Sequence, residues 1–264
     1  MEISFKKMHG AGNDFILIND MRNSFTIDNK FIALMCDRRL GIGADGLILV
    51  QSSRSADFRM VYFNADGFEG TMCGNGGRTV AVFAFLEGLV AEQTIFEAVD
   101  GLHQANILSI ENNNYQVSLS MQDVTHFEST ADTFITDTGS LHLVVQHDNV
   151  SDLDVVSEGR KLRNNSKYAP HGINVNFIQR IDDGFFVRTY ERGVEDETLS
   201  CGTGITAAAL AVHHWFGEED TILKARGGVF KVSFTKQQQR YTNIILEGPV
   251  TVVYEGIFLP INSL

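Results

Sequence analysis

The sequence is poor in several residue types that mark particular classes of protein. Its 264 residues include three cysteines, three prolines and one tryptophan. Cys36, Cys73 and Cys201 are an odd number without CxxC spacing, so they predict neither a disulfide framework nor a zinc cluster, and we expect reduced thiols and no metal site. The scarcity of proline and the 44% of hydrophobic residues exclude extensive disorder and are typical of a globular chain.

Long apolar runs and an excess of positive charge are missing as well. No segment approaches the roughly 18 apolar residues of a membrane span, and the opening MEISFKKMHGAGNDF lacks the apolar core of a signal peptide. The sequence therefore predicts a cytoplasmic protein. A net charge of −12 gives no attraction for nucleic acid or a membrane surface, so a small-molecule substrate is the expected partner. The sequence is compatible with a homodimer.

The two halves of the sequence repeat one arrangement. A shift of 128 residues, the separation of the last two cysteines, aligns identical residues around both cysteines: Tyr62 with Tyr190, Glu69 with Glu197, Cys73 with Cys201, Gly74 with Gly202, Gly76 with Gly204 and Ala81 with Ala209. Two copies are too few for a stacked repeat protein, which needs about three or more units. We therefore predict a duplicated α+β fold of two pseudo-symmetric domains that face each other across a ligand site.

Hydrophobic patterning places similar elements in both halves. Helices are predicted at about 29–39, 75–87 and 203–216, the last two followed by Gly88 and Gly217 in the position that a helix C-terminus prefers. The polar stretch 120–132 predicts the join, so the domains are 1–122 with Cys73 and 123–264 with Cys201. Alternation of β-branched residues predicts strands at 14–18, 47–50, 58–63, 94–98, 104–108, 115–120, 141–146, 173–179, 185–190, 221–226, 229–235 and 243–254.

Cys73 and Cys201 each precede glycines and a helix, in CGNG and CGTG. Unsatisfied N–H groups and the positive end of a helix dipole favour a thiolate there, and the glycines allow backbone to approach a ligand. A single such cysteine is more often a buried packing residue, as we expect for Cys36. Two matched thiols suit removal of a proton from one face of a carbon and its return to the other, as in racemisation or epimerisation. Nucleophilic catalysis would give the second cysteine no role.

Five stretches closely resemble motifs of the diaminopimelate epimerase family. The resemblance runs in order over nearly the whole chain. It implies two domains, each a curved, mostly antiparallel sheet around a central helix, with the last strand, about 250–264, returning to the first domain. It also implies an isomerase that needs neither pyridoxal phosphate nor another cofactor and that interconverts LL- and meso-diaminopimelate in lysine and peptidoglycan precursor biosynthesis. The stretches are KMHGAGNDF (7–15), GIGADGL (41–47), YFNADGFEGTMCGNGGR (62–78), NVNFIQ (174–179) and TYERGVEDETLSCGTG (189–204).

The same resemblance implies roles for individual residues. Cys73 and Cys201 are the two acid/base thiols. Backbone N–H groups hold the reacting α-carboxylate, and polar side chains hold the remaining amino and carboxylate groups, with Arg192 suited to a carboxylate and Glu191 to an ammonium. His142 is expected beside the substrate. The backbone donors belong to Gly74, Asn75, Gly202 and Thr203, and the side chains to Asn13, Asn64, Asn174, Glu191 and Arg192.

Some positions depart from the family pattern. Ser140 and Leu141 stand where Asn-Pro is usual before the histidine, Gly46 stands where some members have glutamine, and His171-Gly172 replaces a commonly charged position. The change at Ser140 removes a side-chain amide expected near the substrate. The change bears on fine substrate specificity rather than on the chemistry.

Other interpretations remain beside the epimerase. A proline or hydroxyproline racemase of the same fold would share the CGTG motif, and a non-catalytic amino-acid-binding relative could keep the site without turnover. The glycines of GIGADG fit GxGxxG, but they follow a helix and precede a strand, the reverse of a dinucleotide-binding turn. His213 and His214 are adjacent on a helix and cannot share a face, so they do not predict a metal site.

Overall fold

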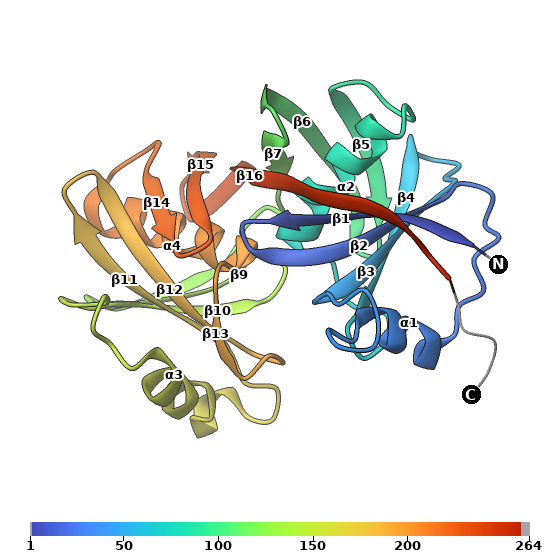
Figure 1. The fold of residues 1–264 in the computed structure, drawn as a ribbon. Helices are drawn as coiled ribbons and strands as arrows, with labels where there is room; N and C mark the ends of the chain where they lie inside the picture. Colours follow the sequence, from blue (N-terminus) through green and yellow to red (C-terminus); the bar gives the residue numbers. More distant parts are fainter. Residues whose placement is uncertain (1, 260–264) are drawn as a thin grey trace. The chain divides into compact units, whose positions relative to one another are not determined.

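The structure is a computed structural model that describes residues 2–259 (Figure 1). Contacts divide the chain into two compact units, unit 1 with Met1–Leu119 and Pro249–Leu264 and unit 2 with Ser120–Gly248. The division predicted from the sequence lies three residues further on, between residues 122 and 123. Within residues 2–259, no helix is both long and apolar enough to cross a bilayer.

Unit 1 is a ring of strands around one helix. Its first seven strands are neighbours in sequence order, and the later part of β16 lies between β7 and β1, so that Ile3 pairs with Phe258 and Gly10 with Val250. The last strand thus returns to the beginning of the chain. The strands are β1 (Ile3–Gly10), β2 (Asn13–Asp20), β3 (Gly46–Gln51), β4 (Phe58–Asn64), β5 (Gln93–Ala98), β6 (Gly101–Glu111), β7 (Asn114–Ser120) and β16 (Arg240–Phe258).

The helix inside this ring is α2 (Gly74–Leu86), which packs against β1, β2, β3, β4 and β6. Every residue from Gly74 to Ala84 is buried, because strands cover the helix on all sides. Its sequence is accordingly apolar or small around its whole circumference rather than amphipathic. The helix ends at Leu86 with Glu87 as its C-cap, and Gly88 follows with a positive φ of 69°, as predicted.

Unit 2 repeats this plan around α4 (Gly202–Phe216), which packs against β9, β10, β11, β12 and β15. Ten of its residues between Gly202 and Val212 are buried, and it ends at Gly217 with a φ of 70°. The order is β8-β9-β10-β11-β12-β14-β15-β16, with β13 beside β12. The strands are β8 (Phe127–Ser129), β9 (Thr133–Asp137), β10 (Leu141–Gln146), β11 (Asn174–Ile181), β12 (Gly184–Glu191), β13 (Asp196–Thr198), β14 (Ile222–Ala225) and β15 (Gly228–Gln237).

The topology confirms the duplicated fold. In unit 1, α1 (Asn29–Cys36) connects the parallel strands β2 and β3, and α3 (Val155–Arg163) connects the parallel strands β10 and β11 in unit 2. The central helix then connects β4 to β5 in one unit and β12 to β14 in the other, again as parallel pairs. The other strand pairs whose register is described are antiparallel, so the strands of each unit are mixed but mostly antiparallel.

The sequence missed several elements. It did not predict β1, β8, β9, β13 or α3, and it extended the first helix to residue 39. That helix ends at Cys36 because Asp37 has extended backbone, with a ψ of 125°.

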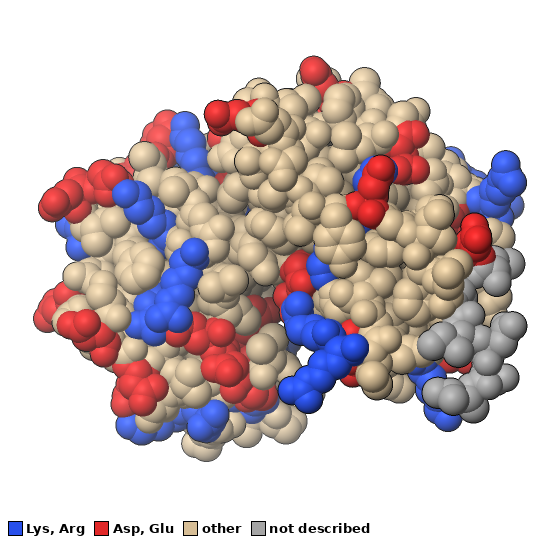
Figure 2. Space-filling model, in the orientation of Figure 1, with Lys and Arg blue, Asp and Glu red and all other residues tan. Residues whose placement is uncertain are grey.

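On the face drawn in Figure 2, Asp and Glu side chains are spread over the surface alongside Lys and Arg.

Candidate active site

Cys73 and Cys201 occupy the same position in the two units. Each is the N-cap residue of the central helix, with φ/ψ of −114°/121° at Cys73 and −126°/114° at Cys201. This extended backbone places each thiol beside the first turn of its helix, where N–H groups have no intrahelical acceptor. The positive end of the helix dipole stabilises a negative charge there, on a thiolate or on a bound carboxylate.

In unit 1, two asparagines surround Cys73. Its Sγ lies 3.5 Å from Oδ1 of Asn13, and Nδ2 of Asn75 lies 3.5 Å from the same oxygen. Asn13 is the first residue of β2 and Asn75 belongs to the first turn of α2. A Cβ at Gly10 would lie 2.7 Å from the carbonyl oxygen of Asn75, so glycine allows β1 and α2 to meet this closely. The structure therefore brings together three of the predicted residues of this unit.

Beneath this turn lies Arg78, a side chain that is 0% exposed. Its Nη2 donates to Oδ1 of Asn75 at 2.7 Å and its Nη1 donates to the carbonyl oxygen of Gly74 at 3.2 Å. Burial lowers the pKa of Arg78 to about 10, while the negative charge of a Cys73 thiolate raises it. At neutral pH Arg78 is thus a cation within the helix that follows the thiol.

Asn64, the remaining predicted residue of unit 1, is the last residue of β4 and is exposed. Among residues 2–259 its side-chain amide makes no hydrogen bond, so the structure does not join it to the group around Cys73. It pairs across the sheet with Gly46. A Cβ at Gly46 would lie 2.5 Å from Cε2 of Tyr62 and from the carbonyl oxygen of Phe63, so the structure has no room for a side chain at this position.

In unit 2, hydroxyl groups and an imidazole surround Cys201. Its Sγ lies 3.3 Å from Oγ1 of Thr203, and that oxygen lies 2.9 Å from Nε2 of His142. Ser140 Oγ lies 2.9 Å from the same nitrogen and 3.3 Å from Oγ1 of Thr203. The serine that replaces the usual asparagine is therefore part of the hydrogen-bond network beside the thiol.

The protonation of His142 follows from its neighbours. Asn176 Nδ2 donates to the carbonyl oxygen of Leu143 at 3.2 Å, and its Oδ1 accepts from Thr189 Oγ1 at 2.9 Å, so the amide nitrogen faces Nδ1 of His142, 3.1 Å away. Nδ1 therefore accepts, and the proton of the neutral ring is on Nε2. Complete burial, followed by the charge of Arg192, lowers the pKa of His142 to about 3, so the ring is neutral at physiological pH.

The other polar residues predicted in unit 2 lie at the ends of β11 and β12. Asn174 donates through Nδ2 to Ser140 Oγ at 3.2 Å and to the carbonyl oxygen of Leu141 at 3.1 Å. Its Oδ1 accepts from the backbone N–H of Arg192 at 2.9 Å. The Arg192 guanidinium reaches the carbonyl oxygen of His171 at 3.5 Å, and Glu191, half-buried, ends β12.

Two glutamates that precede the cysteines by four residues differ in their surroundings. Glu69 is exposed. The Glu197 side chain is 9% exposed, and its carboxylate accepts from both Nε and Nη2 of Arg188 at 2.6 Å and pairs with Arg226 at 2.9 Å. No role was predicted for Arg78 or Asn176, although both belong to the stretches 62–78 and 174–179. Arg78 directly follows Gly77, and Asn176 lies two residues after Asn174. Their position within these stretches is the signal that the sequence offered.

Cys36 has the surroundings expected of a packing residue. It is 3% exposed within the apolar cluster of α1 and the ring of unit 1. Burial raises the pKa of its thiol to about 12. Cys36 is therefore protonated at neutral pH and does not share the environment of the two N-cap cysteines. Among residues 2–259, no three His, Cys, Asp or Glu side chains cluster in a way that could hold a metal ion.

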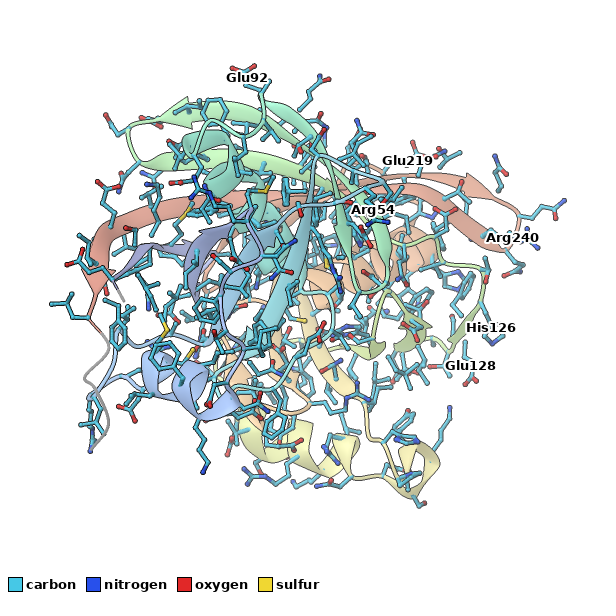
Figure 3. The ribbon with its side chains drawn as sticks, turned by 90° about the vertical axis from the view of Figure 1, so that its right-hand side faces the viewer. Arg54, Glu92, His126, Glu128, Glu219 and Arg240 are labelled. Carbon is cyan, nitrogen blue, oxygen red and sulfur yellow. The ribbon has the colours of Figure 1, made fainter. Side chains whose placement is uncertain are left out.

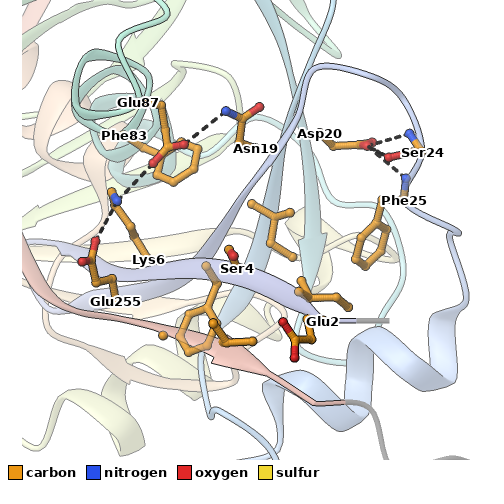
Figure 4. A pocket seen from close by; sticks show the side chains of 15 residues that line it. Glu2, Ser4, Lys6, Asn19, Asp20, Ser24, Phe25, Phe83, Glu87 and Glu255 are labelled. Carbon is orange, nitrogen blue, oxygen red and sulfur yellow. Dashed lines mark hydrogen bonds and ion pairs between the residues drawn. The ribbon is translucent and has the colours of Figure 1, made fainter.

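A cavity of about 700 Å³ lies in unit 1, away from Cys73 (Figure 4). Its lining includes Phe83 and Glu87 at the C-terminal end of α2, whereas Cys73 precedes the N-terminal end. Lys6 pairs there with Glu87 at 3.0 Å and with Glu255 at 2.9 Å. None of the predicted site residues lines this cavity, and Lys6, Glu87 and Glu255 are paired with one another.

Comparison with known proteins gives one consistent family. The family model described as diaminopimelate epimerase matches residues 5–126 and 134–253. The diaminopimelate epimerase of Flavobacterium psychrophilum is 45% identical over 253 residues, which cover 94% of this chain and 97% of that protein.

Solved structures with low sequence identity share the fold. A phenazine biosynthesis protein of the PhzF family from Bacillus anthracis superposes with a TM-score of 0.75 at 15% identity, covering 98% of this chain and 100% of that one. A probable proline racemase from Agrobacterium radiobacter gives a TM-score of 0.69 at 16% identity, covering 99% and 93%. At these identities the likeness establishes the architecture alone.

Proposed function

The chain belongs to the diaminopimelate epimerase family, and we propose that it interconverts LL- and meso-diaminopimelate without a cofactor, using Cys73 and Cys201 as the two acid/base groups. One thiolate removes the α-proton while the other thiol delivers a proton to the opposite face of the same carbon. The observation that carries the proposal is the repeated position of the two cysteines, each the N-cap residue of a buried central helix in a chain of this family.

The first turns of α2 and α4 supply the electrostatics that such a reaction needs. Loss of the α-proton places negative charge on the α-carboxylate, which becomes enolate-like. Backbone N–H groups of Gly74 and Asn75, and of Gly202 and Thr203, are the donors that would stabilise this charge. They are held in place before the reaction starts, because both helices are buried within their units. Preorganised donors avoid the cost of reorienting solvent.

The polar side chains outside these turns would hold the rest of the substrate. Arg192 can pair through two parallel hydrogen bonds with the distal carboxylate, and Glu191 can accept from the distal ammonium. Asn13, Asn64 and Asn174 add amide groups that can bind amino or carboxylate groups. His142 acts on this set through Thr203 and Ser140, since its imidazole contacts both hydroxyl groups.

A proline or hydroxyproline racemase is the alternative within the same fold. A solved proline racemase shares this architecture, which supports the fold and leaves the substrate open. Arg192 and Glu191 favour the larger substrate, since a cyclic amino acid offers no second carboxylate and ammonium for them. A non-catalytic amino-acid-binding protein would have no use for two thiols at matched helix starts.

The proposal also covers the compartment, the cofactor requirement and the assembly of the enzyme. We place it in the cytoplasm, because the reaction needs reduced cysteines and that compartment keeps thiols reduced. The same pair of thiols would supply both proton transfers, so no cofactor is assigned. A homodimer is the assembly we propose to look for in solution.

The test is proton NMR in D2O, following α-deuteration and interconversion of the LL and meso forms with no added cofactor, and with proline as a parallel substrate. Wild type should turn over diaminopimelate alone. Cys73→Ala and Cys201→Ala should each lose about 100-fold or more, the usual contribution of a general acid or base. Cys36→Ala is the matched control and should retain activity, because that thiol lies buried elsewhere.

Each other outcome has a definite meaning. Turnover of proline alone would move the protein to the racemases. Exchange that survives in either of the two variants would remove that cysteine from the mechanism. No exchange with either substrate in a folded wild-type protein would refute the proposed activity.

A further inference from the structure

The loop between β12 and β13 carries or adjoins the residues proposed to hold the distal end of the substrate. Glu191 is the last residue of β12 and pairs with Asp196, the first of β13, so residues 192–195 form the whole loop. The backbone N–H of Glu195 donates to the carbonyl oxygen of Glu191 at 2.8 Å. This bond closes the loop as one tight turn, and the conformation of the turn therefore sets where Arg192 lies beside Glu191.

Glu195 has an unusual backbone conformation in this turn, with a positive φ of 59°. Residues other than glycine, asparagine and aspartate are uncommon there, because the Cβ crowds the backbone. The carboxylate gives a reason for glutamate. One oxygen accepts from the backbone N–H of Gly193 at 3.0 Å, and the other accepts from the hydroxyl group of Tyr190 at 3.1 Å. Arg163 donates to the first oxygen through Nε at 3.0 Å and Nη2 at 2.8 Å. A glycine would leave these donors without this acceptor.

Two of these partners belong to closely packed parts of unit 2. Tyr190 of β12 is 0% exposed. A Cβ at Gly159 would lie 2.4 Å from Cβ of Tyr190, so α3 lies directly against β12 at this point. Arg163 is the last residue of α3, and its side chain is 22% exposed. The carboxylate of Glu195 therefore anchors the turn both to a buried strand residue and to a helix.

Arg163 and Arg192 also lie beside the same short segment. Nη1 of Arg192 donates to the carbonyl oxygen of His171 at 3.5 Å. A Cβ at the next residue, Gly172, would lie 2.9 Å from Cζ of Arg163, and glycine also permits the φ of 71° found there. The pair His171-Gly172, which departs from the family pattern, thus leaves room for one guanidinium and accepts from the other.

We propose that Glu195 and Arg163 are positioning residues, which hold the turn so that Arg192 and Glu191 can bind the distal carboxylate and ammonium of the substrate. This inference rests on the proposed function and deepens it by giving the turn and α3 a part in substrate recognition. The distal groups take no part in the proton transfers. A misplaced turn therefore weakens binding of the substrate and of the transition state alike, which raises KM and leaves kcat nearly unchanged.

The first test is steady-state kinetics with LL-diaminopimelate. Glu195→Asn keeps a residue that tolerates a positive φ, but its shorter side chain takes the acceptor away from Tyr190 and Arg163. We expect KM to rise about tenfold, the contribution of one hydrogen bond to a charged group, with kcat within about threefold of wild type. Glu195→Gln retains the length and an oxygen for Arg163 and Gly193. Its nitrogen can donate to the hydroxyl of Tyr190, so KM should return to within about threefold of wild type.

Variants of α3 test the other partner. Arg163→Met removes the guanidinium and should raise KM in the same way, whereas Lys161→Ala breaks an exposed pair on the same helix and should change neither constant. A purely structural role would act differently, because a destabilised protein has a smaller active fraction and so a lower kcat at unchanged KM. A wild-type KM in Glu195→Asn, or a fall of kcat alone, would overturn the inference. So would a KM in Glu195→Gln as high as that in Glu195→Asn.

A measurement without substrate follows the turn itself. The N–H of Gly193 donates to the Glu195 carboxylate, so NMR of amide hydrogen exchange reports whether the turn is held. Exchange at Gly193 should be about tenfold faster in Glu195→Asn than in wild type and should stay close to wild type in Glu195→Gln. Equal exchange in wild type and Glu195→Asn would overturn the role of the carboxylate. Because this measurement uses no substrate, a wild-type protein that fails to turn over diaminopimelate refutes the proposed function separately.

Discussion

Gly204 approaches Asn176 so closely that no side chain fits between them. A Cβ at Gly204 would lie 2.3 Å from Oδ1 of Asn176 and 3.3 Å from Cβ of Cys201. Gly204 belongs to the first turn of α4, and Asn176 is the β11 residue that orients His142. This one contact therefore fixes the position of the first turn of α4 and also the side chain that orients His142 in the hydrogen-bond network of Cys201.

Gly204→Ala should therefore destabilise unit 2 and lower activity. The methyl group must displace Asn176 or the first turn of α4, and overpacking of this kind costs about 1–3 kcal/mol. The equivalent change Gly76→Ala in unit 1 is the control. Its Cβ would come closest to the ends of two flexible side chains, Met60 at 3.1 Å and Ile48 at 3.3 Å, and would lie at an ordinary contact distance of 3.6 Å from Cβ of Cys73. Urea unfolding should show a lower midpoint for Gly204→Ala than for Gly76→Ala, and equal midpoints would contradict this account.

The tautomer of His142 is a second prediction. The ring should be neutral with its proton on Nε2, because Asn176 donates to Nδ1. Nitrogen NMR of labelled protein should show that state throughout the range from pH 5 to 8. In Asn176→Asp a carboxylate would replace the donor, and the proton should move to Nδ1. A wild-type ring protonated at Nδ1, or charged at pH 7, would contradict the geometry.

The same histidine should make stability fall in acid. The unfolded chain binds a proton at His142 near pH 6.5, whereas the folded protein binds it only near pH 3, because burial lowers the pKa to about 3. Between these values the unfolded state holds more protons, so the free energy of unfolding decreases as pH falls below 6.5, by up to about 1.4 kcal/mol per pH unit.

Replacing His142 removes this contribution. His142→Gln should show a flatter decline of the urea midpoint between pH 6.5 and pH 4 than wild type. His126→Gln is the control, since that side chain is exposed at the edge of unit 2 (Figure 3). His213 and His214, whose pKa values burial also lowers, remain in every variant and add a common slope of the same sign.

The fold was largely predictable where pattern and repeat agreed. Both central helices follow from CGNG and CGTG, a run of small and apolar residues, and a glycine just after the helix end. The helix α3 was missed because its sequence, VVSEGRKLR, is mostly polar and buries only Val155 and Gly159. The short strand β13 has three residues, DET, whose pairing depends on β12 and not on any local preference.

The candidate site was predictable only in part, because local sequence places the two thiols but distant strands supply their partners. The positions of Cys73 and Cys201 follow from local sequence, since the residues that place them are their immediate neighbours. The partners of these thiols come from distant strands: Asn13 lies 60 residues from Cys73, and His142 lies 61 residues from Thr203. Hydrogen bonds between such residues depend on sheet register, which a single sequence does not specify.

The last prediction concerns Arg188, which binds both the segment 150–153 and Glu197, four residues before Cys201. Its Nη1 donates to the carbonyl oxygens of Val150, Ser151 and Leu153, and its other two nitrogens hold Glu197 of β13. The side chain is 6% exposed. Arg188→Met should reduce the free energy of unfolding by about 3 kcal/mol, since it removes the largely buried partner of Glu197, leaves that carboxylate with the more exposed Arg226 alone, and deprives three carbonyl oxygens of their donor.

The measurement is urea unfolding of Arg188→Met beside Lys161→Ala, which breaks an exposed pair between Lys161 and Glu158 on α3. The exposed pair should contribute at most about 0.5 kcal/mol. Because Glu197 precedes Cys201 by four residues, Arg188→Met should also lower the rate of epimerisation, whereas Lys161→Ala should not. Similar losses of stability in the two variants would mean that Arg226 alone is enough to compensate Glu197, and that Arg188 does not hold this loop.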